Sequence, residues 1–289
     1  MPTLRALTQY ASNILHLAQH PFLSSYPLSS SSSSLSAFNL PLNQQTQTSF
    51  DHTCPVDSPV SCHNSTSFPD SCCFIYPGGQ LLQTQFWDTA PSIGPADSWT
   101  LHGLWPDLCD GSYPSFCKAA PMYHNISAIL SSSNASLPPL TSSSSQSAQK
   151  TSTSTLLDYM LKYWLPNRGS PDSFWEHEWN KHGTCINTLS PTCYSPSTSP
   201  SPSTSTQPYA PGDEVISFFT RAASLFRTLD TYAALSASGI VPSTTQTYRR
   251  EEISAALRKV TGRDVLVRCR GNRLNEVWYS FNVRGSLQE

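Results

Sequence analysis

Two stretches of this sequence decide its interpretation: WTLHGLWPD at residues 99–107 and FWEHEWNKHGTC at residues 174–185. In the second, polar side chains recur at three- and four-residue steps, which places them on one face of a helix. Such a helix gathers two imidazoles, a carboxylate and an ammonium in one stripe: His177, Glu178, Lys181 and His182. Trp175 and Trp179 can pack on the opposite side. Because this stripe is costly to bury and folding does not need it, we interpret it as a site that binds an anion and moves protons.

These residue types match the needs of RNA cleavage by attack of a ribose 2′-hydroxyl. That reaction requires a base for the hydroxyl proton, an acid for the leaving 5′-oxygen, and cationic donors for the phosphorane. Two histidines suit the proton steps, because an unperturbed pKa of about 6.5 allows one to be neutral and the other charged. We expect His102, in a strand that leads into Trp105, to complete the pair with His182. Lys181 suits the phosphate, and Glu178 can orient a histidine or share a proton with the phosphate. The alternative of two ordinary structural histidines is disfavoured by these surroundings.

Two other functions compete with a metal-free nuclease. A zinc hydrolase is disfavoured because three residues, not two, separate Glu178 from His182. His177 and His182 are five residues apart, about 140° around a helix, so we expect that they do not share a metal ion from one face. A catalytically weak binding protein is disfavoured by the completeness of the polar set. We therefore expect a site with no metal and no cofactor.

Outward from these stretches, strand and helix patterns mix without repeated strand–helix–strand units. Strands are expected at residues 73–87, as two strands around a Pro77-Gly78-Gly79 turn, at 99–104 before Pro106, and at 265–269 and 277–283, near a Gly271-Asn272 turn. Helices are expected at 156–165 before Pro166, at 174–185, at 213–229 with Asp213 as a candidate N-cap, and at 250–260 before Gly262. We predict an α+β fold, with a mainly antiparallel central sheet flanked by helices and stapled by disulfides.

Cysteines and sequons indicate the secretory pathway. Eight of the nine cysteines lie between Cys54 and Cys193, a density that favours disulfides and an oxidising compartment. Asn64, Asn125 and Asn134 begin acceptor sequons for glycosylation. We expect a secreted or vacuolar glycoprotein, although residues 4–23 form a poor signal peptide because polar residues interrupt the apolar run. No stretch approaches the ~20 apolar residues of a membrane span.

Composition divides the chain into a leader and one catalytic domain. Residues 1–50 are expected to be a poor leader and a Ser-rich disordered linker, and 51–289 a single domain. Ser/Thr-rich stretches near 131–155 and 190–208 are expected to be surface insertions, because they cannot bury apolar area to offset chain entropy. The net charge of −2 excludes a stoichiometric packager of nucleic acid but not an enzyme with a local basic site.

TLHGLWPD and FWEHEWNKHGTC closely resemble the two active-site signatures of the ribonuclease T2 family, in its fungal branch. The resemblance covers about Cys54 to Leu287, and two long motifs in the right order make it specific. It implies metal-free cleavage of single-stranded RNA to 2′,3′-cyclic phosphates, followed by slower opening to 3′-phosphates. DNA, which lacks the 2′-hydroxyl, is expected to be inert. We also expect a monomer that binds no membrane.

The resemblance implies residue roles that spacing alone leaves open. His102 and His182 match the proton-transfer pair, and we favour His182 as the base of the first step, which the sequence itself cannot assign. The phosphate-contacting and charge-stabilising positions match His177, Glu178 and Lys181. The primary base pocket matches Trp105, Asp107 and Tyr113, with unknown base preference. From the residues alone, packing in the core explains Trp105 and Tyr113 as well as stacking on a base does.

The resemblance also implies four disulfides: Cys54–Cys73, Cys62–Cys109, Cys72–Cys193 and Cys117–Cys185. Cys269 is left over, since its family partner lies further downstream, and we interpret this as a C-terminal truncation or an altered gene model. Losing that bridge is expected to cost about 2–5 kcal/mol of stability. Eight of the 17 Lys and Arg residues lie between Arg249 and Arg273. They can guide RNA, but we favour the interpretation that they form a helix's solvated face.

Overall fold

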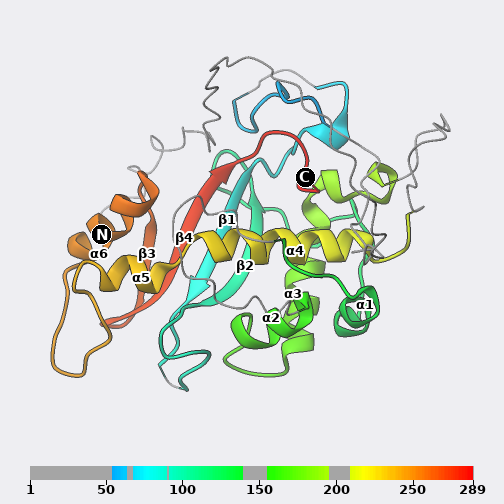
Figure 1. Cartoon of the computed structure of the whole chain (residues 1–289). Helices are drawn as coiled ribbons and strands as arrows, with labels where there is room; N and C mark the ends of the chain where they lie inside the picture. The colour runs from blue at the N-terminus through cyan, green and yellow to red at the C-terminus, as the bar shows by residue number, and fades with distance from the viewer. Residues whose placement is uncertain (1–53, 64–67, 90, 139–154, 195–208, 289) are drawn as a thin grey trace, which may run out of the picture.

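A four-stranded antiparallel sheet with the strand order β2-β1-β4-β3 forms the centre of the protein (Figure 1). In this computed structural model, the described residues are 54–63, 68–89, 91–138, 155–194 and 209–288. The strands are β1 (Gln80–Phe86), β2 (Thr100–Asp107), β3 (Leu266–Arg270) and β4 (Arg273–Asn282). Helices pack on this sheet, which confirms the predicted α+β class. Residues 1–50 and most of the two Ser/Thr-rich stretches lie outside the described residues.

Two strand predictions need correction. Residues 73–87 contain one strand, β1, because the backbone before it bonds to a side chain rather than to a neighbouring strand: Tyr76 N donates to Asn187 Oδ1, and Asn187 Nδ2 donates to Phe74 O. The second strand does not end before Pro106 but continues to Asp107. Pro106 is tolerated because β2 is an edge strand that pairs only with β1. The predicted closing hairpin is confirmed, with Gly271 and Asn272 between the paired ends of β3 and β4.

The helices are α1 (Ile126–Ser133), α2 (Leu156–Tyr163), α3 (Pro171–Lys181), α4 (Asp213–Thr228), α5 (Thr231–Ser236) and α6 (Arg250–Thr261). The sequence patterns missed α1 and α5, which are short. Asp213 is the first residue of α4 rather than its N-cap, which is Gly212. Gly262 ends α6 as expected, with a φ of 66° that suits glycine. The stretch near 131–155 therefore begins inside α1, and Pro191–Cys193 in the other stretch forms a 3₁₀ turn.

Two apolar clusters hold the helices on the sheet. The larger joins α1–α4 to β1 and β2 and contains the fully buried Trp164, Trp175 and Trp179. The smaller joins α5 and α6 to β3 and β4 around Leu257, Val267 and Val277. Burial of this area is the main force that fixes α3 beside the sheet. Figure 1 shows α4 crossing the sheet, with α2 and α3 near the strand β2.

All four expected disulfides are present: Cys54–Cys73, Cys62–Cys109, Cys72–Cys193 and Cys117–Cys185. Cys269 is exposed and free. Asn125 and Asn134 are exposed, so their glycosylation stays a prediction, and Asn64 lies outside the described residues. Among the described helices, none has the length and apolar character needed to cross a membrane.

Candidate active site

A β-bulge presents His102 to the site. Thr84 of β1 pairs with Gly103 and Gln85 pairs with Leu101, so His102 is the extra residue between them. A bulge of this kind redirects the side chain that it carries. The main chain is held by Trp164, whose Nε1 donates to the carbonyl oxygen of His102 at 2.8 Å.

Aromatic rings clamp the His102 imidazole. Phe86 stacks on it with 3.9 Å between ring centroids, and Phe174 of α3 lies at 5.9 Å. The imidazole side chain is 20% exposed, so it reaches the surface of the site while its plane is fixed.

Glu276 of β4 completes the surroundings of His102, and the sequence patterns did not identify it. Its Oε1 lies 2.8 Å from His102 Nδ1. The other imidazole nitrogen, Nε2, lies 3.8 Å from Glu178 Oε1. His102 therefore stands between two carboxylates, one facing each ring nitrogen. Only one weak signal was available in the sequence, namely an acidic residue directly before the strand expected at 277–283.

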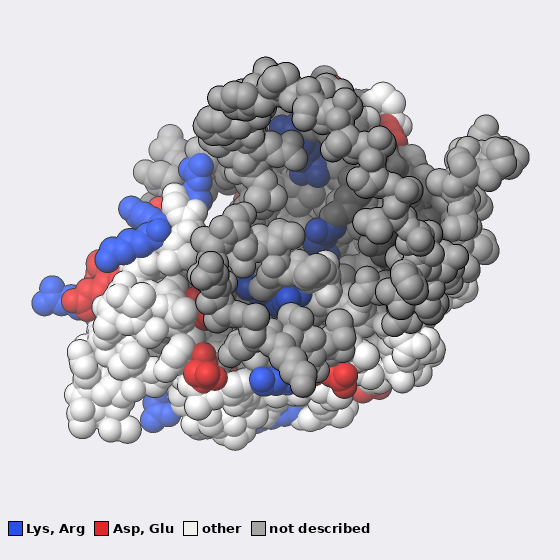
Figure 2. Space-filling model, in the orientation of Figure 1, with Lys and Arg blue, Asp and Glu red and all other residues white. Residues whose placement is uncertain are grey.

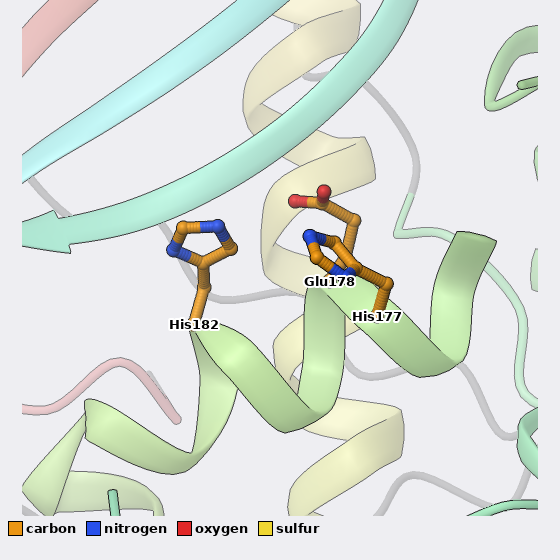
Figure 3. Close-up of side chains that lie close together, drawn as sticks. All are labelled: His177, Glu178 and His182. Atoms are coloured by element: carbon orange, nitrogen blue, oxygen red, sulfur yellow. The ribbon is translucent and has the colours of Figure 1, made fainter. Parts of the chain in front are cut away.

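The second motif folds as α3 followed by a change of direction at His182. Ser170 caps the helix through its side chain, Pro171 occupies the first turn, and the helix ends at Lys181. His182 is the C-cap, with a φ of −113°. The sequence analysis predicted His182 on the helical stripe, but it lies just beyond the end of the helix. Figure 3 shows Glu178 and His177 projecting from α3, with His182 at the end of the helix.

His182 is almost fully buried against Trp105. Its residue is 5% exposed, and its ring stacks on the Trp105 ring at 5.0 Å. Its Nδ1 atom has no hydrogen-bond partner among the described residues. Burial lowers the pKa of His182 to about 3, with Lys181, His177 and His102 adding to the shift. The imidazole is therefore neutral at mildly acidic pH.

Glu178 is buried beneath the site and is fixed by Trp105. The residue is 1% exposed, and Trp105 Nε1 donates to Glu178 Oε2 at 2.9 Å. Gly103 makes this approach possible, because a Cβ atom there would collide with Glu178 Oε2 and Trp105 Nε1. Burial raises the pKa of Glu178 to about 6. The carboxyl group can therefore exchange a proton in the acidic range.

The spacing argument against a shared metal ion is wrong. One ligand atom each from His177, Glu178 and His182 lie within 4.8 Å of one another. The reason is that His182 leaves the helical path at the C-cap, so its ring turns back to 6.3 Å from that of His177. Partial desolvation, Lys181 and His102 lower the pKa of His177, which remains an exposed residue. The geometry of these three residues is therefore compatible with a metal site as well as with a phosphate site.

One cavity of about 690 Å³ brings all eight predicted site residues together. It is lined by the proton-transfer and phosphate candidates, by Trp105, Asp107 and Tyr113, and by residues of the β3–β4 hairpin. Asp107 is 9% exposed, and burial raises its pKa to about 7, whereas Tyr113 is 66% exposed. Trp105 contacts both imidazoles of the predicted proton-transfer pair, His102 and His182. It also packs edge-on against Trp278 at 5.3 Å.

Five of the eight basic residues between Arg249 and Arg273 fall into two groups. Arg268 and Arg270 line the cavity, whereas Arg250, Arg258 and Lys259 lie on α6 around a separate shallow hollow. Figure 2 shows Lys and Arg side chains at the edge of the molecule where α6 lies in Figure 1. The interpretation as one solvated helix face therefore fits only part of the cluster.

Known proteins are similar to this chain in sequence and in structure. The Ribonuclease T2 family profile matches residues 65–288. Ribonuclease Trv from Hypocrea rufa is 48% identical over 237 residues, which are 82% of this chain and 88% of that protein. Ribonuclease T2 from Aspergillus oryzae is 47% identical over 81% of this chain and 74% of its own. The crystal structure of Actibind, a T2 ribonuclease, superposes with a TM-score of 0.67 at 46% identity, over 82% of this chain and 87% of that one. The chain therefore belongs to the ribonuclease T2 family.

Proposed function

We propose that this protein is a T2-type endoribonuclease that cleaves single-stranded RNA without a metal ion. The products are 2′,3′-cyclic phosphates, which it then hydrolyses to 3′-phosphates. The observation that carries the proposal is the contrast between two imidazoles in one cavity. His182 is buried and kept neutral, whereas His102 lies between the carboxylates of Glu178 and Glu276. A neutral base and a protonated acid are the pair that transesterification requires.

In the first step His182 takes the proton of the 2′-hydroxyl, and the 2′-oxygen attacks the phosphorus. His102 gives its proton to the 5′-oxygen as that bond to phosphorus breaks. This assignment follows the electrostatic difference between the two imidazoles. In the second step the roles reverse: His102 takes a proton from water as the water oxygen bonds to phosphorus, and His182 protonates the 2′-oxygen as its bond to phosphorus breaks and the ring opens.

The remaining polar groups stabilise the phosphorane. Lys181 and His177 line the same cavity as Glu178 and His182, so their donors can meet non-bridging oxygens. Glu178, with its pKa near 6, can share a proton with one of these oxygens. Asp107 and Tyr113, with the exposed part of Trp105, form the candidate base pocket. At acidic pH the Asp107 carboxyl carries a proton, so it can both donate to and accept from a base.

Four further statements belong to the same proposal. The substrate is RNA and not DNA, because the attacking group is the 2′-hydroxyl. The site uses no cofactor, the protein acts as a monomer, and it reaches the extracellular space or the vacuole by the secretory pathway. The four disulfides suit that oxidising route.

The test is to incubate the protein with single-stranded RNA at about pH 5 in EDTA and to identify the product ends by mass spectrometry. We expect cyclic phosphate ends first and 3′-phosphates later, and no cleavage of an all-deoxy oligonucleotide. His182→Ala and His102→Ala should each lose several orders of magnitude in rate. His124→Ala is the matched control, because the His124 side chain is 78% exposed and pairs with Glu176 outside the cavity. Inert wild-type protein that is well folded would instead support a binding role.

A further inference from the structure

The cavity continues beyond the proton-transfer residues to the wall formed by β3 and β4. Arg268 and Arg270 line this part, and both are exposed residues of β3. None of the groups proposed above for chemistry or for base binding lies on β3. The two arginines therefore line the cavity but have no role in the reaction proposed above.

Strand register places Arg268 on the catalytic face of the sheet. Arg268 pairs with Glu276, and Glu276 pairs with Phe86. Directly paired residues of neighbouring strands point to the same face. The side chains of Glu276 and Phe86 both contact His102, so Arg268 shares their face. Three strand spacings separate β3 from β2, about 14 Å between backbones. Arg268 is thus three strands away from His102, the residue proposed to protonate the leaving 5′-oxygen.

An aromatic contact orients the Arg268 side chain. Its guanidinium carbon lies 4.6 Å from the centre of the Trp278 ring. Trp278 in turn packs edge-on against Trp105, so a continuous ring surface links the arginine to the catalytic framework. Stacking of this kind holds the guanidinium plane while leaving its edge donors free, which suits bidentate contact with a phosphate.

Among the described residues, no carboxylate forms an ion pair with Arg268 or Arg270, whereas Arg258 of α6 pairs with Asp264. The nearest acid in register is Glu276, and its carboxylate is held by His102. Two unpaired cations at the end of a cavity that handles a phosphodiester favour binding of a second phosphate.

We infer that Arg268 and Arg270 form a subsite for a backbone phosphate of a nucleotide beyond the two that flank the cleaved bond. This inference rests on the proposed ribonuclease function and deepens it. The subsite binds only chains longer than a dinucleotide and recognises phosphate rather than base. It gives the enzyme a preference for polymeric RNA over short fragments.

The test compares substrates of two lengths. Arg268→Gln and Arg270→Gln are combined in one variant, and Arg250→Gln with Lys259→Gln on α6 makes a control with the same loss of charge. We expect the β3 variant to cleave a dinucleoside monophosphate with wild-type kcat/KM. On an RNA decamer at low salt, kcat/KM should fall roughly tenfold for each arginine. Its dependence on log salt should flatten by about 0.7 for each lost contact. The α6 control should change neither substrate appreciably.

A binding measurement separates this inference from the proposed catalysis. A decamer with 2′-O-methyl riboses has no attacking hydroxyl, so its affinity can be measured even if the protein cleaves nothing. The β3 variant should bind this decamer more weakly than the α6 control does, and less steeply with salt. Both side chains are exposed, so folding should be unchanged, which far-ultraviolet circular dichroism can verify. Equal loss on the dinucleotide and the decamer, or equal behaviour of the two variants, would overturn the subsite.

Discussion

Replacing Glu276 tests the assignment of His102 as the acid of the first step. The Glu276 carboxylate is 2.8 Å from His102 Nδ1, and its side chain is 13% exposed, so solvent screens the contact only in part. A hydrogen bond to a charged group contributes about 1.5–3 kcal/mol. Glu276→Ala removes this hydrogen bond, which aligns the imidazole. If the transition state loses the same free energy, kcat should fall roughly 10- to 100-fold at every pH.

Glu276→Gln separates charge from alignment. The amide oxygen can still accept from Nδ1, so kcat at low pH should remain within about tenfold of wild type. A rate for Glu276→Gln well above that of Glu276→Ala would show that the hydrogen-bond acceptor, rather than its charge, aligns the imidazole.

The assay is steady-state cleavage of a dinucleoside monophosphate between pH 3 and pH 8. Glu251→Gln removes an exposed carboxylate from α6 and is the matched control. A Glu276→Ala variant that keeps the wild-type rate, or a Glu276→Gln variant that is no more active than Glu276→Ala, would refute the positioning role.

Three further predictions concern the same site. Gly103→Ala should still fold, but its free energy of unfolding, measured in urea, should be lower by about 1–3 kcal/mol and most activity should be lost. The reason is that the new Cβ displaces Glu178 or Trp105 and breaks their hydrogen bond. A variant as stable as wild type would contradict this close packing. Burial raises the pKa of Asp107 from its ordinary 3.8 to about 7, so the folded state holds a proton that the unfolded chain loses as pH rises from about 4 to 7. Asp107→Asn, measured by urea unfolding, should therefore match wild type at pH 4 and exceed it by up to about 4 kcal/mol at pH 8, and an equal difference at both pH values would count against this. EDTA should leave activity unchanged, whereas loss of activity restored by zinc would favour the His177, Glu178 and His182 cluster as a metal site.

The sequence alone was sufficient for the parts of the protein that depend on local pattern. Helical periodicity predicted α2, α4 and α6, and Gly262 marked the end of α6, because an apolar face and a left-handed stop are properties of neighbouring residues. The two motifs were specific enough to identify the family, and the resemblance then named eight of the residues that line the cavity. The cysteine positions, compared with the family, predicted all four disulfides.

Patterns failed where the partner of a residue lies far along the chain. Residues 74–79 form no strand because Asn187, more than a hundred positions away, takes up their hydrogen bonds. The bulge at His102 depends on pairing with β1, which local sequence cannot express. The metal argument failed because it extended an ideal helix through His182, where the real chain turns.

The sequence by itself determined which chemistry is present, and tertiary structure decided how its charges are set. Imidazole, carboxylate and ammonium types could be read directly from the two motifs. Only the fold buries the imidazole of His182 and keeps it neutral. The fold alone also brings Glu276, on the last strand, to the imidazole of His102. It also separates Arg268 and Arg270 from the helix cations that are their neighbours in sequence. The physical reason is that burial and charge proximity are properties of space, and contacts between residues distant in the chain create them.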